Sequence, residues 1–198
     1  MKRGVGHYIR KGLGGRGMAT KRFGGTIKTA GLLHDVLSSL SNGGATPGGL
    51  SVDLLRGQTA RAIIDAIIDA VRPVDGTLDA EGSRRCINDA LSELLELFPD
   101  ADILNLEPKA REYVMEVYLA QEVFQRFCQD VGEAIGRKAA SIVSGLARLE
   151  EACAYIRETI AASLRKQSSN PTPISAAAIS MMAESTLRDA FEVFESWT

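Results

Sequence analysis

Acidic and basic side chains at helical spacing are the first candidates for chemistry in this 198-residue sequence. Arg61, Asp65 and Asp69 recur every four residues and so share one helix face, where two carboxylates could act as a general acid and base. The same spacing places Arg61 one turn from Asp65, which is an ordinary i,i+4 charge pair. We therefore interpret the three residues as a solvated charged face.

A glycine-rich segment near the start has the spacing of a nucleotide-binding motif. Gly12-Leu-Gly-Gly-Arg-Gly17 matches the GxGxxG fingerprint. In dinucleotide-binding proteins that loop follows a β-strand and opens a strand–helix alternation, and neither pattern is present in this sequence. We interpret the match as accidental and expect no cofactor.

Metal-binding and nucleophilic residues are too dispersed to predict a site. The three cysteines and two histidines are far apart, and each cysteine falls in a segment with helical periodicity: Cys86, Cys128, Cys153, His7 and His34. Thiolate metal sites and disulfide frameworks need close or paired spacings. We expect no metal site, and buried free thiols in a reducing cytoplasm. Because no nucleophile with an adjacent base is visible either, we expect no catalytic residue and no enzyme activity.

The charge distribution is strongly asymmetric although the formal net charge is only −2. Eight basic residues precede Asp35, the first acid, which leaves 15 basic against 25 acidic residues, a formal charge of −10, for the rest of the chain. Phosphate contacts, an acidic partner surface, the protein's own acidic helices or an organelle-targeting presequence could each account for such a segment. Aromatic residues for base stacking are few there. We predict partner contacts in this region at Arg10, Lys11, Arg16, Lys21, Arg22 and Phe23.

The stretch 107–132 is predicted to be the central helix. Its broad apolar face is a core face by its period of 3.6 residues, and consists of Tyr113, Val117, Ala120, Phe124, Phe127, Cys128 and Val131. A second, narrower strip of Met115, Leu119 and Val123 lies on the opposite side. This strip indicates either a helix packed on two sides within a bundle or a seam for another protein, and we include its three residues among the candidate partner contacts.

The remaining periodicities predict an all-α fold, a single helical bundle of about six helices with a Gly-rich basic N-terminal segment. Residues 1–17 hold too many glycines for a strong helix, beyond a short turn near residues 7–11. Residues 18–166 form the predicted bundle, and 167–198 a linker with a last helix. Further helices are expected at about 18–41, 59–71, 77–97 and 139–166, with Thr77 as an N-cap. No run approaches the roughly 18 apolar residues that a membrane-spanning helix needs.

The order of these features resembles the QatB family of the bacterial Qat anti-phage defence system. The likeness runs over about residues 3–166, and its main marks are Arg10-Lys-Gly-Leu-Gly-Gly-Arg-Gly17 with Lys21-Arg22-Phe23, the glycine loop 43–49, Arg72-Pro73 with Asp75-Gly76-Thr77, and a long aromatic helix closing at Asp130-Val131-Gly132.

The resemblance implies a non-enzymatic cytoplasmic subunit that works with QatC, a QueC-like protein similar to the 7-cyano-7-deazaguanine synthases. A Qat ATPase and a TatD-like nuclease are further implied partners. It also implies a protein substrate that presents its N-terminus for deazaguanine attachment, usually after a long Gly-, Ser- and Pro-rich tail. This sequence departs from that pattern because it opens at Met1-Lys2-Arg3. The alternative prediction is a nucleic-acid-binding accessory protein that uses the same basic segment.

Overall fold

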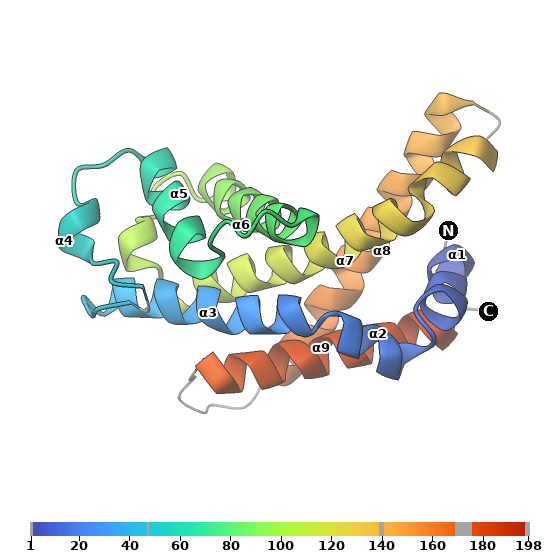
Figure 1. The fold of residues 1–198 in the computed structure, drawn as a ribbon, viewed down its shortest axis with the longest axis horizontal. Helices are drawn as coiled ribbons and strands as arrows, with labels where there is room; N and C mark the ends of the chain where they lie inside the picture. The colour runs from blue at the N-terminus through green and yellow to red at the C-terminus, as the bar shows by residue number, and fades with distance from the viewer. Residues whose placement is uncertain (1, 47, 139–140, 169–175, 197–198) are drawn as a thin grey trace. The chain divides into compact units, whose positions relative to one another are not determined.

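The computed structural model describes residues 2–46, 48–138, 141–168 and 176–196, and these residues contain helices and no strand. The all-α prediction is therefore confirmed. The elements, drawn in Figure 1, are α1 (Lys2–His7), the π-helical turn η1 (Tyr8–Gly12), α2 (Arg16–Arg22), α3 (Gly24–Ser41), α4 (Val52–Leu55), α5 (Ala60–Val71), α6 (Leu78–Leu97), the 3-10 turn η2 (Ile103–Asn105), α7 (Pro108–Lys138), α8 (Ile142–Ser168) and α9 (Ala176–Ser196). Of the nine α-helices among the described residues, six have 12 or more residues, in keeping with the predicted number of about six.

The chain forms two compact units, and each combines segments that are distant in sequence. The first contains Met1–Gly25, Leu119–Thr172 and Met181–Thr198, and the second contains Thr26–Tyr118 and Pro173–Ser180. Helices α3, α7 and α9 therefore contribute residues to both units. The division of the sequence at residues 17 and 166 stays a prediction, since these units do not follow sequence order.

Local sequence signals determine the helix boundaries in the second unit. The Oγ1 of Thr77 accepts the backbone N–H of Ala80 at 3.1 Å, which confirms the predicted N-cap of α6. Thr59 caps α5 in the same way, through the N–H of Ala62 at 3.2 Å. The isoleucines of α5 are buried, and so is the apolar side of α6, from Ala80 to Leu94. Caps and a regular apolar stripe thus agree in this unit.

The N-terminal segment is more helical than its composition predicts. Residues 2–12 form α1 and η1 despite Gly4, Gly6 and Gly12, so the expectation of a single short turn was wrong. The cost of the glycines is offset by burial of apolar side chains that belong to the core of the first unit: Val5, Tyr8, Ile9 and Leu13. The predicted helix 18–41 is likewise interrupted at Phe23, between α2 and α3.

The central helix α7 begins at Pro108, as expected, and continues six residues beyond the predicted end at Gly132. Its deepest burial does not follow the predicted broad face, because Tyr113, Phe124 and Cys128 are only half-buried. The almost completely buried residues combine part of the broad face with the whole of the narrow strip, namely Val114, Met115, Val117, Tyr118, Leu119, Ala120, Val123 and Phe127. This is the pattern of a helix covered on more than one side.

Among the described residues, no helix combines the length and the apolar character needed to cross a bilayer. The cysteines are free thiols, but only Cys86 is buried as predicted, whereas Cys128 and Cys153 are half-buried. Burial, and to a lesser extent Cys153, raises the pKa of the Cys128 thiol to about 11, so that it stays protonated near neutral pH. The sequence also predicts Thr172 as the N-cap of the last helix, and this residue lies outside the described residues.

Candidate functional site

The glycines of the GxGxxG-like segment have structural roles in this fold. A Cβ at Gly12 would lie 2.9 Å from Cδ2 of Tyr8, so the buried ring occupies the space that a side chain would need. Gly14 and Gly15 adopt φ of +81° and +87° in the turn between η1 and α2, a region that L side chains rarely enter. The segment follows a helix and not a strand, in agreement with the interpretation that the nucleotide motif is accidental.

Two aromatic residues anchor the N-terminal elements in the first unit. Tyr8 is 4% exposed, its ring meets Phe127 edge-on at a centroid distance of 5.5 Å, and its hydroxyl donates to Oδ2 of Asp130 at 2.6 Å. Burial, and then this hydrogen bond, raise the pKa of Tyr8 well above its usual value near 10. Phe23 is also 4% exposed and lies 5.4 Å from Phe191 of α9. The backbone that carries the basic residues is therefore fixed by buried contacts.

The predicted basic contact residues lie together on the solvent side of these elements. We call Arg10, Lys11, Arg16, Lys21 and Arg22 the basic face, and all five are exposed. Arg16 forms an ion pair of 2.6 Å with Glu192 of α9, so one cation does dock against the protein's own acidic helix. Arg22 donates to the carbonyl of Gly12 at 3.4 Å across the turn between η1 and α2.

Four predicted contact residues are not available as surface. Phe23, Met115, Leu119 and Val123 are at most 4% exposed within the chain itself. We therefore correct the expectation that the second strip of the central helix is a seam for another protein. Its apolar side chains are already buried within the chain, which agrees with the alternative of a helix packed on two sides. Phe23 likewise serves as an anchor beneath the basic face.

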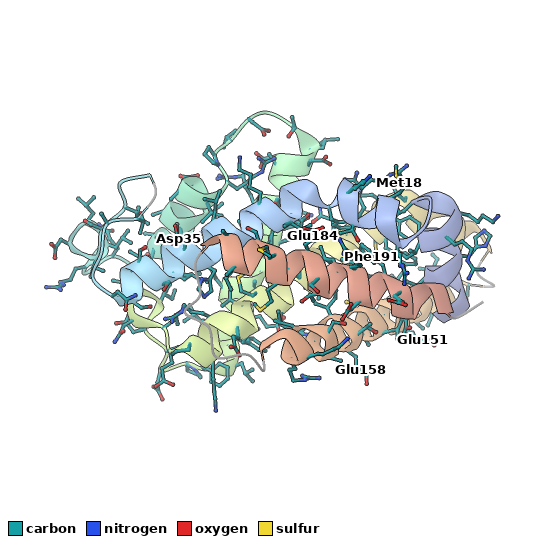
Figure 2. All side chains as sticks on the ribbon, turned by 90° about the horizontal axis from the view of Figure 1, so that it is seen from below. Met18, Asp35, Glu151, Glu158, Glu184 and Phe191 are labelled. Atoms are coloured by element: carbon teal, nitrogen blue, oxygen red, sulfur yellow. The ribbon has the colours of Figure 1, made fainter. Side chains whose placement is uncertain are left out.

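Met18 is a surface residue that the sequence reasoning missed. It lies on α2 between Arg16 and Lys21, is 49% exposed, and points away from α9 in Figure 2. Methionine and arginine are both enriched at protein contact surfaces, where the flexible methionine side chain adapts to a partner. The signal available in the sequence was a large apolar residue among the basic residues Arg16, Lys21 and Arg22.

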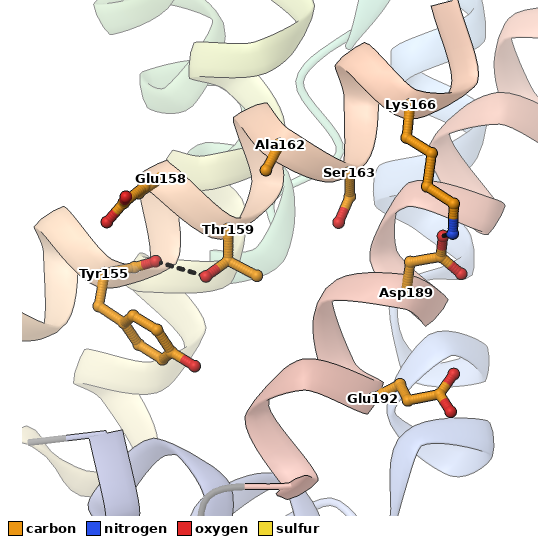
Figure 3. A pocket seen from close by; sticks show the side chains of 8 residues that line it. All are labelled: Tyr155, Glu158, Thr159, Ala162, Ser163, Lys166, Asp189 and Glu192. Carbon is orange, nitrogen blue, oxygen red and sulfur yellow. Dashed lines mark hydrogen bonds and ion pairs between the residues drawn. The ribbon is translucent and has the colours of Figure 1, made fainter.

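A pocket of about 500 Å³ lies between α8 and α9 in the first unit. It is lined by Tyr155, Glu158, Thr159, Ala162, Ser163 and Lys166 of α8 and by Asp189 and Glu192 of α9 (Figure 3). Nζ of Lys166 meets Oδ2 of Asp189 at 2.9 Å, and this bond, with the nearby Glu192, raises the pKa of Lys166. No residue of this pocket was predicted from the sequence as a site.

The α5 residues Arg61, Asp65 and Asp69 form a charged, exposed surface. Asp69 pairs with Arg84 of α6 at 2.7 Å, and Arg84 also donates to the carbonyl of Arg72 at 2.7 Å. Asp65 is exposed to solvent. Asp69 therefore joins α5 to α6 through an ordinary charge pair. Within the part of the chain that the structure describes, no group of three or more His, Cys, Asp or Glu side chains could hold a metal ion.

The fold and the basic face together define an all-α protein whose most distinctive described surface is cationic and firmly anchored. The sequence matches the family described as "Qat anti-phage system associated protein QatB" over residues 14–194, and the chain belongs to this family. It is thus a component of the Qat anti-phage defence system. No curated protein and no solved structure matches the chain.

Proposed function

We propose that this chain is a non-enzymatic binding subunit of the Qat defence complex, and that its basic face docks on an acidic surface of the QueC-like partner QatC. The observation that carries the proposal is the exposure of five cations on a backbone held by Tyr8 and Phe23. A preformed charged surface loses little conformational entropy when a partner binds. Complementary charge would also speed the encounter of the two proteins.

The same burial favours a protein partner over nucleic acid. Single-stranded nucleic acids are usually bound by aromatic stacking together with basic residues. Tyr8 and Phe23, the two aromatic residues of the segment, are each 4% exposed and cannot stack on bases in this structure. Met18 adds an exposed apolar contact suited to a protein surface.

In this proposal the complex acts in the cytoplasm, and the chain places its N-terminus near QatC as the substrate for deazaguanine attachment. The ATPase and the TatD-like nuclease of the system would join the same assembly through other surfaces. The N-terminal helix α1 supports this role, because it packs with η1 and so leads directly into the basic face.

The test is a pull-down and a binding titration of the chain with purified QatC. The informative variant is Lys11→Glu/Lys21→Glu/Arg22→Glu, which leaves the Arg16–Glu192 ion pair intact. We expect affinity to fall roughly ten- to a hundredfold, since three favourable surface charges become repulsive. The loss should be mainly in the association rate and should shrink at high salt.

The matched control reverses three exposed arginines of the second unit, Arg56→Glu/Arg61→Glu/Arg85→Glu, which changes the net charge equally. Equal binding of QatC by wild type and the basic-face variant would refute the proposal. Retention of the wild type on DNA or RNA with a steep salt dependence, lost in the same variant, would instead support the nucleic-acid alternative.

A further inference from the structure

The α8–α9 pocket adjoins the basic face through the Arg16–Glu192 ion pair, and it has the opposite electrostatic character. Its lining holds three carboxylates and one ammonium group, a formal charge of −2. Asp189 is paired with Lys166, and Glu192 with Arg16. The third carboxylate, Glu158, is exposed and forms no ion pair within the described part of the chain. An anion would meet repulsion here, whereas a cation would be attracted.

Hydroxyl groups add acceptors to the same wall. Ser163 is 7% exposed, and its hydroxyl, which is directed into the pocket in Figure 3, has no hydrogen-bond partner among the described residues. The Thr159 hydroxyl donates to the carbonyl of Tyr155 at 2.8 Å, which leaves its lone pairs available. A hydroxyl that opens onto a pocket and has no bond within the chain can accept a hydrogen bond from a ligand without losing another.

The lining also distinguishes among cations. Divalent metals require several converging oxygen ligands, and no such group of side chains exists in the described chain. An ammonium group needs only a few acceptors around three N–H donors. The methyl of Ala162 and the ring of Tyr155 provide apolar surface for an aliphatic chain and an aromatic face for the cation. The volume of about 500 Å³ is in the range of small-ligand sites.

We propose that the α8–α9 pocket binds a primary ammonium group on an aliphatic chain, with Glu158 as the charged acceptor and Ser163 and Thr159 as the neutral ones. Both polyamines and the lysine side chains of a protein carry this group. None of these three acceptors belongs to the basic face, and the basic-face variant keeps the Arg16–Glu192 pair, so the two proposals can fail independently.

The experiment is calorimetric titration of the full chain with 1,5-diaminopentane, with spermidine and with a short acetylated, amidated lysine peptide at physiological salt. We expect saturable binding that is roughly tenfold weaker in Glu158→Gln, because a charge-assisted hydrogen bond is lost. Ser163→Ala should weaken it by roughly three- to tenfold. Binding of the diamines alone would identify a free polyamine as the source, and tighter binding of the peptide would identify a lysine side chain.

The matched control is Glu150→Gln, because Glu150 is an exposed acid on α8 two turns before Glu158 and outside the pocket. It should bind the amines as the wild type does, and 1,5-pentanediol, which has the same chain without charge, should not compete. Circular dichroism at the titration temperature verifies that each variant is folded. Absence of saturable amine binding, or equal weakening in Glu150→Gln and Glu158→Gln, would overturn the proposal.

Discussion

Replacing Tyr8 by Phe should loosen the N-terminal elements without disturbing the rest of the chain. The variant keeps the ring contact with Phe127 at 5.5 Å but loses the 2.6 Å hydrogen bond to Asp130. Hydrogen bonds to charged groups contribute about 1.5–3 kcal/mol. Asp130 is exposed, so water can replace the lost donor, and we expect a cost of about 1 kcal/mol.

Hydrogen exchange resolved by peptide is the assay for this variant. A loss of about 1 kcal/mol corresponds to roughly fivefold faster exchange of amides in α1, η1 and α2 if these elements open together. Tyr113→Phe is the matched control, because Tyr113 also donates to a carboxylate, Glu93, at 2.5 Å but in the second unit. It should leave exchange in residues 2–22 unchanged.

The pH dependence of the same variant provides a second measurement. The pKa of Tyr8 is raised on folding, so its protonated form is favoured in the native state. The resulting stability is complete below the unfolded pKa near 10 and is lost as pH rises above it. Wild type should therefore lose stability faster than Tyr8→Phe above pH 10. Identical exchange and identical alkaline profiles in the two proteins would refute the assignment of Tyr8 as an anchor.

Three further predictions concern glycine, capping and histidine. Gly12→Ala should destabilise the chain by about 1–2 kcal/mol, because its Cβ would lie 2.9 Å from the Tyr8 ring, whereas Gly17→Ala, with open space around it, should be neutral or stabilising in urea unfolding. Thr77→Ala should cost about 1 kcal/mol and Thr77→Ser much less, by the same measurement. Burial, and then the charge of Arg111, lower the pKa of His34 to about 4. The contribution of neutral His34 to the free energy of unfolding is therefore fully present above pH 6.5 and decreases as the pH falls toward 4. His34→Gln should remove this decrease when unfolding in urea is measured as a function of pH.

The sequence predicted best those elements whose signals are local. Helices α5 and α6 were expected within a residue or two of their observed ends, because Thr59 and Thr77 cap them and the apolar positions repeat every three or four residues. The N-terminal helices were missed for the opposite reason. Their composition disfavours a helix, and the partners that stabilise them, Phe127 and Asp130, lie far along the chain.

For the candidate sites too, the sequence predicted the features that depend on single residues and not those that depend on how helices pack. That the basic residues lie at the surface followed from their charge, and all five cations are exposed. The assignment of Met115, Leu119 and Val123 to a partner seam was wrong because periodicity identifies apolar faces but not what covers them. The α8–α9 pocket could not be predicted, since its lining combines residues 155–166 with Asp189 and Glu192 only after the two helices pack.

The pairing of Tyr8 with Asp130 also has a consequence for synthesis of the chain. The two residues are separated by 122 positions, so at roughly 5–20 residues per second the ribosome needs roughly 6–25 s to supply the partner after Tyr8 is made. During that interval the apolar side of the first helices has no native surface to cover it. Completion of the first unit is therefore a late event in translation, and the newly made N-terminus remains accessible to cellular chaperones until then.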